Sequence, residues 1–278
     1  MMAMIDRLRD LKRESIRLMI QGEPCAQVGG TRFGGVPDVP SDFSWPIYNT
    51  ETYDDDTVKP RPLAFLAQFN CAQLPKIEGE ISLPQTGVLS FFYELDSMKW
   101  GYDPKDAGCA RVFWFEDITE ISKATFPEEL AEYYRLPAIT VEAQREDNYP
   151  AEEDFFSHVI DWEEYESSMQ DLGVELPDNC SKLLGWPNII QNNMTVECEM
   201  VSRGYYLGGG WDKLPQDVLE NAKQNSQQDW VLLFQLDTVE KNGFQLMFGD
   251  CGRVYFYIRR EDLISRRFDR VWLVLQCC

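Results

Sequence analysis

Any chemistry in this chain falls to carboxylates, arginines and cysteines, because the sequence holds a single histidine, His158. Ser-His-Asp and Cys-His nucleophilic sites would both have to use that one imidazole. Zinc sites built from two or three histidines are excluded. His158 follows Asp154 at helical spacing among acidic and aromatic residues, which predicts a histidine on a helix surface rather than a catalytic base. We therefore predict no catalytic residue.

The 47 acidic residues make neighbouring carboxylates unavoidable, so their pairing alone does not indicate acid–base catalysis. The acidic cluster within 51–57 lacks the glycine and distal glutamate of a calcium-binding loop, which favours a solvated loop. The glycine-rich stretches 29–35 and 208–210 match neither a dinucleotide fingerprint nor a phosphate loop. Eight cysteines are scattered without a Cys-x-x-Cys pair, which predicts reduced structural thiols. We expect no metal and no cofactor.

Arginines and glutamines remain as candidate ligand-binding groups. An arginine cluster could grip a small anion through paired hydrogen bonds, or it could pair with the chain's own Glu261, Asp262 and Asp269. This cluster comprises Arg259, Arg260, Arg266, Arg267 and Arg270. Asp250 and Arg253 flank two glycines, where they could instead bridge a tight turn. The predicted ligand region comprises Arg32, Trp45, Gln68, Gln235, Asp250 and Arg253.

The net charge of −21 and the pI near 4.4 restrict the partners. An acidic surface repels phosphate backbones, so we expect neither nucleic acid nor an anionic membrane as partner. A basic protein is the natural complement, and solubility alone is the alternative explanation for the charge. No apolar run approaches the roughly 18 residues of a membrane span. Basic residues interrupt 1–21, unlike a signal peptide, which predicts a cytoplasmic protein. The oligomeric state stays open.

Residues 29–46 predict an ordered loop, because their glycines and prolines exclude a helix or a central strand. Three aromatic residues in this block, Phe33, Phe43 and Trp45, would not occur together in a floppy linker. We expect all three to be buried, so that the block fills the core rather than lining a cavity.

Apolar periodicity predicts a mixture of helices and short buried strands. Helices are expected over 4–19, 127–133, 151–172 (one helix or two short ones) and 215–228. Strands are expected over 63–67, 88–93, 111–115, 138–141, 230–234, 253–258 and 271–275. The chain is long enough for a sizeable core, and we predict a single α+β domain, rich in strands, with peripheral helices.

One short sequence pattern occurs twice in the chain. Gln68 closes an early apolar run and Gln235 closes a later one, and each is followed by glycine and an aromatic strand. We interpret this as two similar β-rich halves, 23–145 and 146–278, after an N-terminal helix within 1–22. Chance similarity between apolar strands is the alternative. Each glutamine side chain can both donate and accept, so it can satisfy backbone groups where a buried strand ends.

Several segments resemble the YwqG-like proteins, a bacterial family of unknown function. They are 29–46, 62–70 (PLAFLAQFN), 83–93 (LPQTGVLSFFY), 183–187 (LLGWP) with Gln191, 249–256 (GDCGRVYF) and 268–272 (FDRVW). The resemblance implies a fold of mixed strands and helices and attaches no activity to it.

Two functional hypotheses follow. The first is a non-enzymatic protein-binding module, with an immunity-like role, that engages a basic partner. The second is an enzyme or small-anion binder that uses carboxylates and arginines in a cleft between the two halves.

Overall fold

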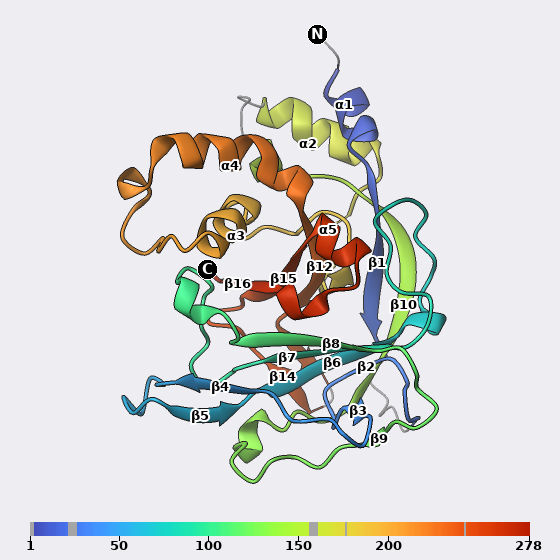
Figure 1. The fold of residues 1–278 in the computed structure, drawn as a ribbon. Helices are drawn as coiled ribbons and strands as arrows, with labels where there is room; N and C mark the ends of the chain where they lie inside the picture. The colour runs from blue at the N-terminus through green and yellow to red at the C-terminus, as the bar shows by residue number, and fades with distance from the viewer. Residues whose placement is uncertain (1–2, 22–26, 156–160, 176, 242) are drawn as a thin grey trace.

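A computed structural model describes residues 3–21, 27–155, 161–175, 177–241 and 243–278. One ten-stranded antiparallel sheet dominates it (Figure 1), with the strand order β16-β15-β12-β11-β1-β10-β2-β6-β7-β8. These strands are β1 (Arg13–Ile20), β2 (Arg32–Phe33), β6 (Ala64–Asn70), β7 (Val88–Tyr93), β8 (Ala110–Phe115), β10 (Ile139–Asn148), β11 (Lys182–Leu183), β12 (Trp230–Asp237), β15 (Arg253–Arg259) and β16 (Trp272–Gln276). A β-rich fold with few helices is confirmed.

Shorter elements surround the sheet. The small hairpins and bridges are β3 (Asp38–Val39) with β9 (Ser122–Lys123), β4 (Ile47–Thr50) with β5 (Lys59–Pro62), and β13 (Val239–Lys241) with β14 (Phe244–Leu246). The α-helices are α1 (Met4–Asp10), α2 (Trp162–Asp171), α3 (Thr195–Ser202), α4 (Gln216–Asp229) and α5 (Arg260–Ile264). The single-turn 3₁₀ helices are η1 (Cys71–Gln73), η2 (Pro104–Asp106), η3 (Glu132–Tyr134), η4 (Glu152–Asp154), η5 (Trp211–Lys213) and η6 (Phe268–Arg270). In Figure 1, α1, α2 and α4 lie at the top and β4–β5 at the bottom.

The N-terminal helix expected over 4–19, within 1–22, is wrong for most of its length. Helix α1 ends at Asp10, and β1 begins at Arg13 and pairs with β10 over eight residues. Ile16 and Leu18 are buried at the two-residue period of a strand. The strand is formed because β10, far away in the sequence, supplies the hydrogen bonds. Strand β10 also crosses the predicted boundary between residues 145 and 146.

The other expected elements have mixed outcomes. All seven expected strands are confirmed, as is the helix over 215–228, which is α4. The helix expected over 127–133 is wrong: the segment forms turns and η3. Arg135 donates to the carbonyl oxygens of Leu130 and Pro127, which holds this segment as a loop. The expected helix within 151–172 exists as the short elements η4 and α2.

The glycine block lies against the core, as expected, although its aromatic residues are buried to different degrees. Phe33 is fully buried and its ring lies 6.2 Å from that of Phe234, on the other arm of the sheet. Phe43 and Trp45 are only half-buried, packed against Phe92. The burial prediction is therefore confirmed for Phe33 and wrong for the other two, which cover the face of the sheet from outside.

No helix among the described residues has the length and apolar composition needed to cross a membrane.

Candidate functional site

Two buried glutamines hold the loops at the ends of β6 and β12. The Oε1 atom of Gln68 accepts from the Asp38 backbone at 3.0 Å, and its Nε2 donates to Gly30 O at 2.9 Å. The Oε1 atom of Gln235 accepts from the Asn188 backbone at 2.8 Å, and its Nε2 donates to Cys180 O at 2.6 Å. Both side chains are fully buried. Each glutamine satisfies backbone groups at a strand end, as the sequence predicts.

A buried cation lies beside each glutamine, in the strand residue that pairs with it. Arg32 forms an ion pair with Asp38 at 2.8 Å, and both side chains are almost inaccessible. We call Arg32, Asp38 and Gln68 the first cluster, and Lys182, Asn188 and Gln235 with the neighbouring Arg253 the second cluster. In the second cluster the cation is Lys182. Neutral Asn188 takes the place of Asp38, because its backbone N–H donates to the glutamine as that of Asp38 does. Lys182 Nζ donates to Trp186 O at 3.1 Å, and burial lowers the pKa of this lysine to about 8. The first cluster is therefore a closed ion pair, and the second is not.

The six residues of the predicted ligand region do not meet in one place. Arg32 and Gln68 belong to the first cluster, and Gln235 and Arg253 to the second. Trp45 lies on the outer face against Phe92. Asp250 is exposed in a turn, and the expected bridge between it and Arg253 is wrong, because Arg253 pairs with Asp237 at 2.9 Å.

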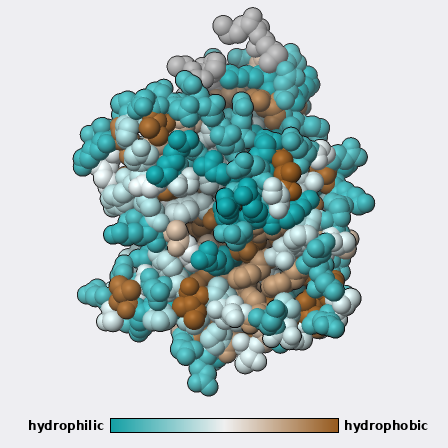
Figure 2. Space-filling view, viewed as in Figure 1, coloured by the Kyte–Doolittle hydropathy of each residue, from teal (hydrophilic) through white to brown (hydrophobic). Residues whose placement is uncertain are grey.

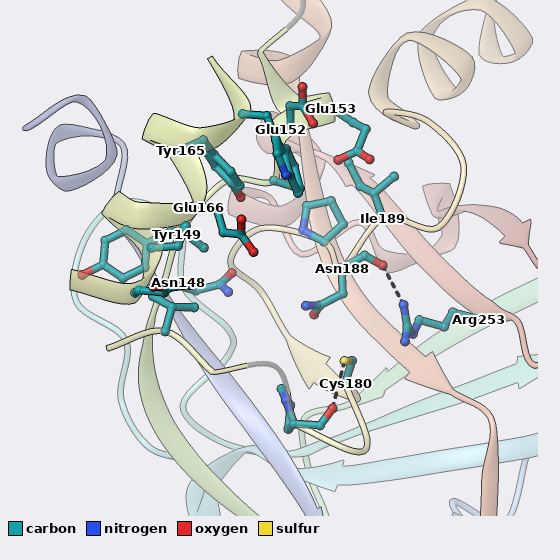
Figure 3. A pocket seen from close by; sticks show the side chains of 17 residues that line it. Asn148, Tyr149, Glu152, Glu153, Tyr165, Glu166, Cys180, Asn188, Ile189 and Arg253 are labelled. Atoms are coloured by element: carbon teal, nitrogen blue, oxygen red, sulfur yellow. Dashed lines mark hydrogen bonds between the residues drawn. The ribbon is translucent and has the colours of Figure 1, made fainter. Parts of the chain in front are cut away.

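A hollow of about 730 Å³ lies above the second cluster (Figure 3). Helix α2 forms one wall, the segment 148–153 another, and the segment 187–189 the floor. The lining residues are Asn148, Tyr149, Ala151, Glu152, Glu153, Trp162, Tyr165, Glu166, Met169, Gln170, Val174, Pro177, Cys180, Pro187, Asn188, Ile189 and Arg253. Apolar and aromatic side chains dominate this lining. The hollow therefore combines a large apolar surface with a few charges, the usual make-up of a binding site.

Three carboxylates give the hollow its charge. Glu152 is half-buried, whereas Glu153 and Glu166 are exposed. In Figure 3 Glu166 points down from α2 near Asn148, and Glu153 lies above Ile189. Within the described residues these three carboxylates form no ion pair. Arg253 is the single basic residue in the described lining, and Asp237 offsets its charge. The hollow is therefore electronegative.

The wall that carries Glu152 and Glu153 is fixed by buried hydrogen bonds. Asp154 accepts from Ala151 N at 2.9 Å and from Asn193 Nδ2 at 2.6 Å. Burial raises the pKa of Asp154 to about 7. Tyr165 Oη donates to Pro150 O at 3.1 Å and so ties α2 to the same wall. These contacts hold both carboxylate-bearing walls in position.

An exposed tryptophan stands beside the glutamates. Trp162 is 53% exposed and stacks on Tyr165, with the ring centres 5.7 Å apart. It precedes Glu166 by one helical turn, so the two side chains share a face of α2. A cation held by Glu166 could also rest on this indole ring, which attracts positive charge.

The arginine cluster near the C-terminus pairs largely with the chain's own acids. Arg267 and Arg270 contact Asp262, at 2.5 and 3.9 Å, and Arg259 contacts Glu199 at 2.7 Å. Arg267 also contacts Glu261 at 3.9 Å. Pairing of the arginines with Glu261 and Asp262 is thus confirmed. Among the described residues, Asp269 forms no ion pair with these arginines.

Sequence reasoning missed most of the hollow. Of the residues that line it, only Arg253 is in the predicted ligand region. The signal that could have found the others is the density of acidic and aromatic residues within 151–172. His158 lies outside the described residues. Where the chain is described, no three His, Cys, Asp or Glu side chains gather as a metal site would require.

No curated protein matches the chain. A family model described as a domain of unknown function (DUF1963) matches residues 31–277, which include both glutamine clusters and every residue that lines the hollow. The match extends over most of the sequence, and the chain belongs to the DUF1963 family.

Proposed function

We propose that this chain is a non-enzymatic binding protein that holds a basic segment of a partner protein in the hollow beside α2. The observation that carries the proposal is a set of three glutamates around an aromatic hollow, none of which has an ion-pair partner in the described part of the chain. Lysine and arginine side chains combine an apolar stem with a charged end. Their stems would pack on Trp162 and Ile189, while their charges would lie near the glutamates.

The overall charge supports the same partner. A net charge of −21 attracts a basic surface over long range and speeds its encounter with the protein. The alternative, an enzyme or small-anion binder that uses arginines, has less support. Asp237 offsets the charge of Arg253, and the glutamates would repel an anion entering the hollow.

We further propose that the chain is a YwqG-like member of its family, built from two related halves. The arms β2-β6-β7-β8 and β11-β12-β15-β16 flank the β1–β10 pair in mirrored order. Strand β6 has a register shift between Phe65 and Ala67, and β12 has one between Leu232 and Phe234. Each shift lies at the same distance before its glutamine. The first residue after each two-residue strand has a left-handed backbone, with φ +58° at Gly34 and +61° at Leu184.

The binding proposal is tested by calorimetric titration with two synthetic peptides of equal length. One alternates lysine with leucine, and the other alternates glutamate with leucine. We expect the lysine peptide alone to bind, and its affinity to fall between about 0.05 M and about 0.5 M salt, because salt screens exposed charges. Equal binding of both peptides, or an affinity indifferent to salt, would count against the proposal.

A further inference from the structure

Two exposed cysteines lie near each other where β15 and β16 reach the protein surface. The β15–β16 ladder ends at the pair Arg253–Gln276, and before it a turn is closed by a hydrogen bond from Gly252 N to Phe248 O at 2.8 Å. Cys278 N donates to Asp250 O at 3.3 Å, so Cys278 lies against the peptide group that joins Asp250 to Cys251. A Cβ atom placed on Gly252 would lie 2.7 Å from Cys277 Cβ, so the end of the chain stays close to this turn.

These two thiols differ in exposure from the other cysteines that the structure describes. Cys251 and Cys278 are exposed, whereas Cys71, Cys109, Cys180, Cys198 and Cys277 are buried. Cys277 Sγ lies 2.9 Å from where a Cβ atom on Gly249 would be, which places its thiol in the packed side of the turn. The interpretation of the cysteines as reduced structural thiols therefore suits the buried cysteines but gives no role to this exposed pair.

The spacing suits a covalent bond. The hydrogen bond from Cys278 N to Asp250 O holds Cys278 beside the residue that precedes Cys251. A disulfide joins Cα atoms about 4.4–6.8 Å apart, a span that neighbours across one backbone hydrogen bond can reach by a small local movement. Cys251 lies in the turn that enters β15 and has φ +53°, outside the regular strand geometry. The turn can adjust without disturbing the paired residues that follow it.

We propose that Cys251 and Cys278 are a reversible oxidation site that closes as an intramolecular disulfide. The oxidant is a small-molecule disulfide. One cysteine thiolate attacks it, which forms a mixed disulfide and releases one thiol. The second cysteine thiolate then attacks the protein sulfur of the mixed disulfide and displaces the other thiol. The protein loses two protons and two electrons, and the oxidant is reduced to two thiols.

The cross-link would fix the strand that supports the floor of the hollow. Gln276 Oε1 accepts from the backbone of Ile190 and of Gln191, both at 3.1 Å, and Gln276 Nε2 donates to Asn192 O at 2.8 Å. Gln191 Nε2 donates to Cys277 O at 2.8 Å. A disulfide at Cys278 would hold the end of β16 against the turn and so restrain this hydrogen-bonded loop.

The test treats dilute, full-length protein with glutathione disulfide and maps the peptides under non-reducing conditions by mass spectrometry. We expect one linked peptide pair, Cys251 with Cys278, lighter by two hydrogen atoms and restored by dithiothreitol. C277S should keep this link, and C251S and C278S should each abolish it. Separate glutathione adducts on the two cysteines, a link through Cys277, or a link between two protein molecules would each overturn the proposal. The mapping of the unaltered protein decides the question even if a variant fails to fold.

Discussion

At the level of single residues, the protein buries two cations in different ways. Arg32 has a carboxylate partner at 2.8 Å, whereas Lys182 donates to a backbone carbonyl and lines the same small cavity as neutral Asn188. Burying a charge is costly unless a partner offsets it. For Lys182, burial lowers the pKa to about 8, so the neutral amine becomes accessible near neutral pH. Arg32 depends on Asp38 for its counter-charge.

Substituting Asp38 should therefore be far more damaging than the corresponding change in the second cluster. We expect Asp38→Asn to lower the free energy of unfolding by about 3–5 kcal/mol, because it leaves a buried guanidinium without its counter-charge. Asn188→Asp is the matched control, since it adds a carboxylate near Lys182, and it should change the stability much less. Urea denaturation of both variants measures the difference. Equal losses of unfolding free energy in the two variants would mean that the Arg32–Asp38 pair does not stabilise the protein more than the second cluster does.

A second prediction concerns the pH dependence of stability. Glu197 is 3% exposed, its Oε1 accepts from Asn192, and its Oε2 has no hydrogen-bond partner among the described residues. Burial raises its pKa from 4.5 to about 7. Between these values the folded protein holds a proton that the unfolded chain has lost. The stabilising contribution is therefore complete below pH 4.5 and disappears as the pH rises through about 7.

Glu197→Gln should remove this pH dependence, because the amide does not titrate. We expect wild-type stability to fall relative to the variant by on the order of 2–3 kcal/mol between pH 5 and pH 8. Urea denaturation of both proteins at the two pH values gives the difference, in which the other titrating groups largely cancel. A difference that is constant with pH would show that Glu197 keeps an ordinary pKa.

At the level of elements, the predictable part of the fold is the part whose pattern is local. The strands β7, β12 and β15 are continuous apolar runs, and α4 begins after Pro215, so each could be read from its own residues. Strand β1 could not be predicted from its own residues, because Leu8, Leu11 and Leu18 also fit the period of a helix. Its pairing with β10 decides the outcome, and that contact joins residues more than 100 positions apart.

The loop after β2 depends on Gly34 for a reason that an element-scale test can isolate. Gly34 has φ +58°, and a Cβ atom there would lie 2.2 Å from Pro137 O. Gly173 has φ +69° with no atom within 4 Å of such a Cβ. Gly173→Ala should therefore show the backbone cost alone, about 1–2 kcal/mol. We expect Gly34→Ala to lose at least about 2 kcal/mol more in thermal or urea denaturation. Equal losses would mean that the loop moves aside freely.

At the level of the whole molecule, charge could be predicted from the sequence, but its arrangement could not. Figure 2 shows hydrophilic residues over much of the visible face, with apolar residues in small separate groups. The six predicted ligand residues were chosen by type and sequence position, and they lie in separate places because the two arms of the sheet keep Gln68 and Gln235 apart. The hollow forms where α2, the segment 148–153 and the segment 187–189 meet, and no local pattern predicts that meeting.

The central claim is that the glutamates around the hollow bind a basic segment. Its most direct test is calorimetric titration of the lysine–leucine peptide into two triple variants that change the net charge equally. One is E152Q/E153Q/E166Q at the hollow, and the other is E120Q/E128Q/E129Q, at exposed glutamates outside it. Three charge pairs at solvent-accessible glutamates contribute together about 1–2 kcal/mol, so we predict that the hollow variant binds roughly tenfold more weakly while the control binds as wild type. Equal weakening of both variants, or of neither, would contradict the claim.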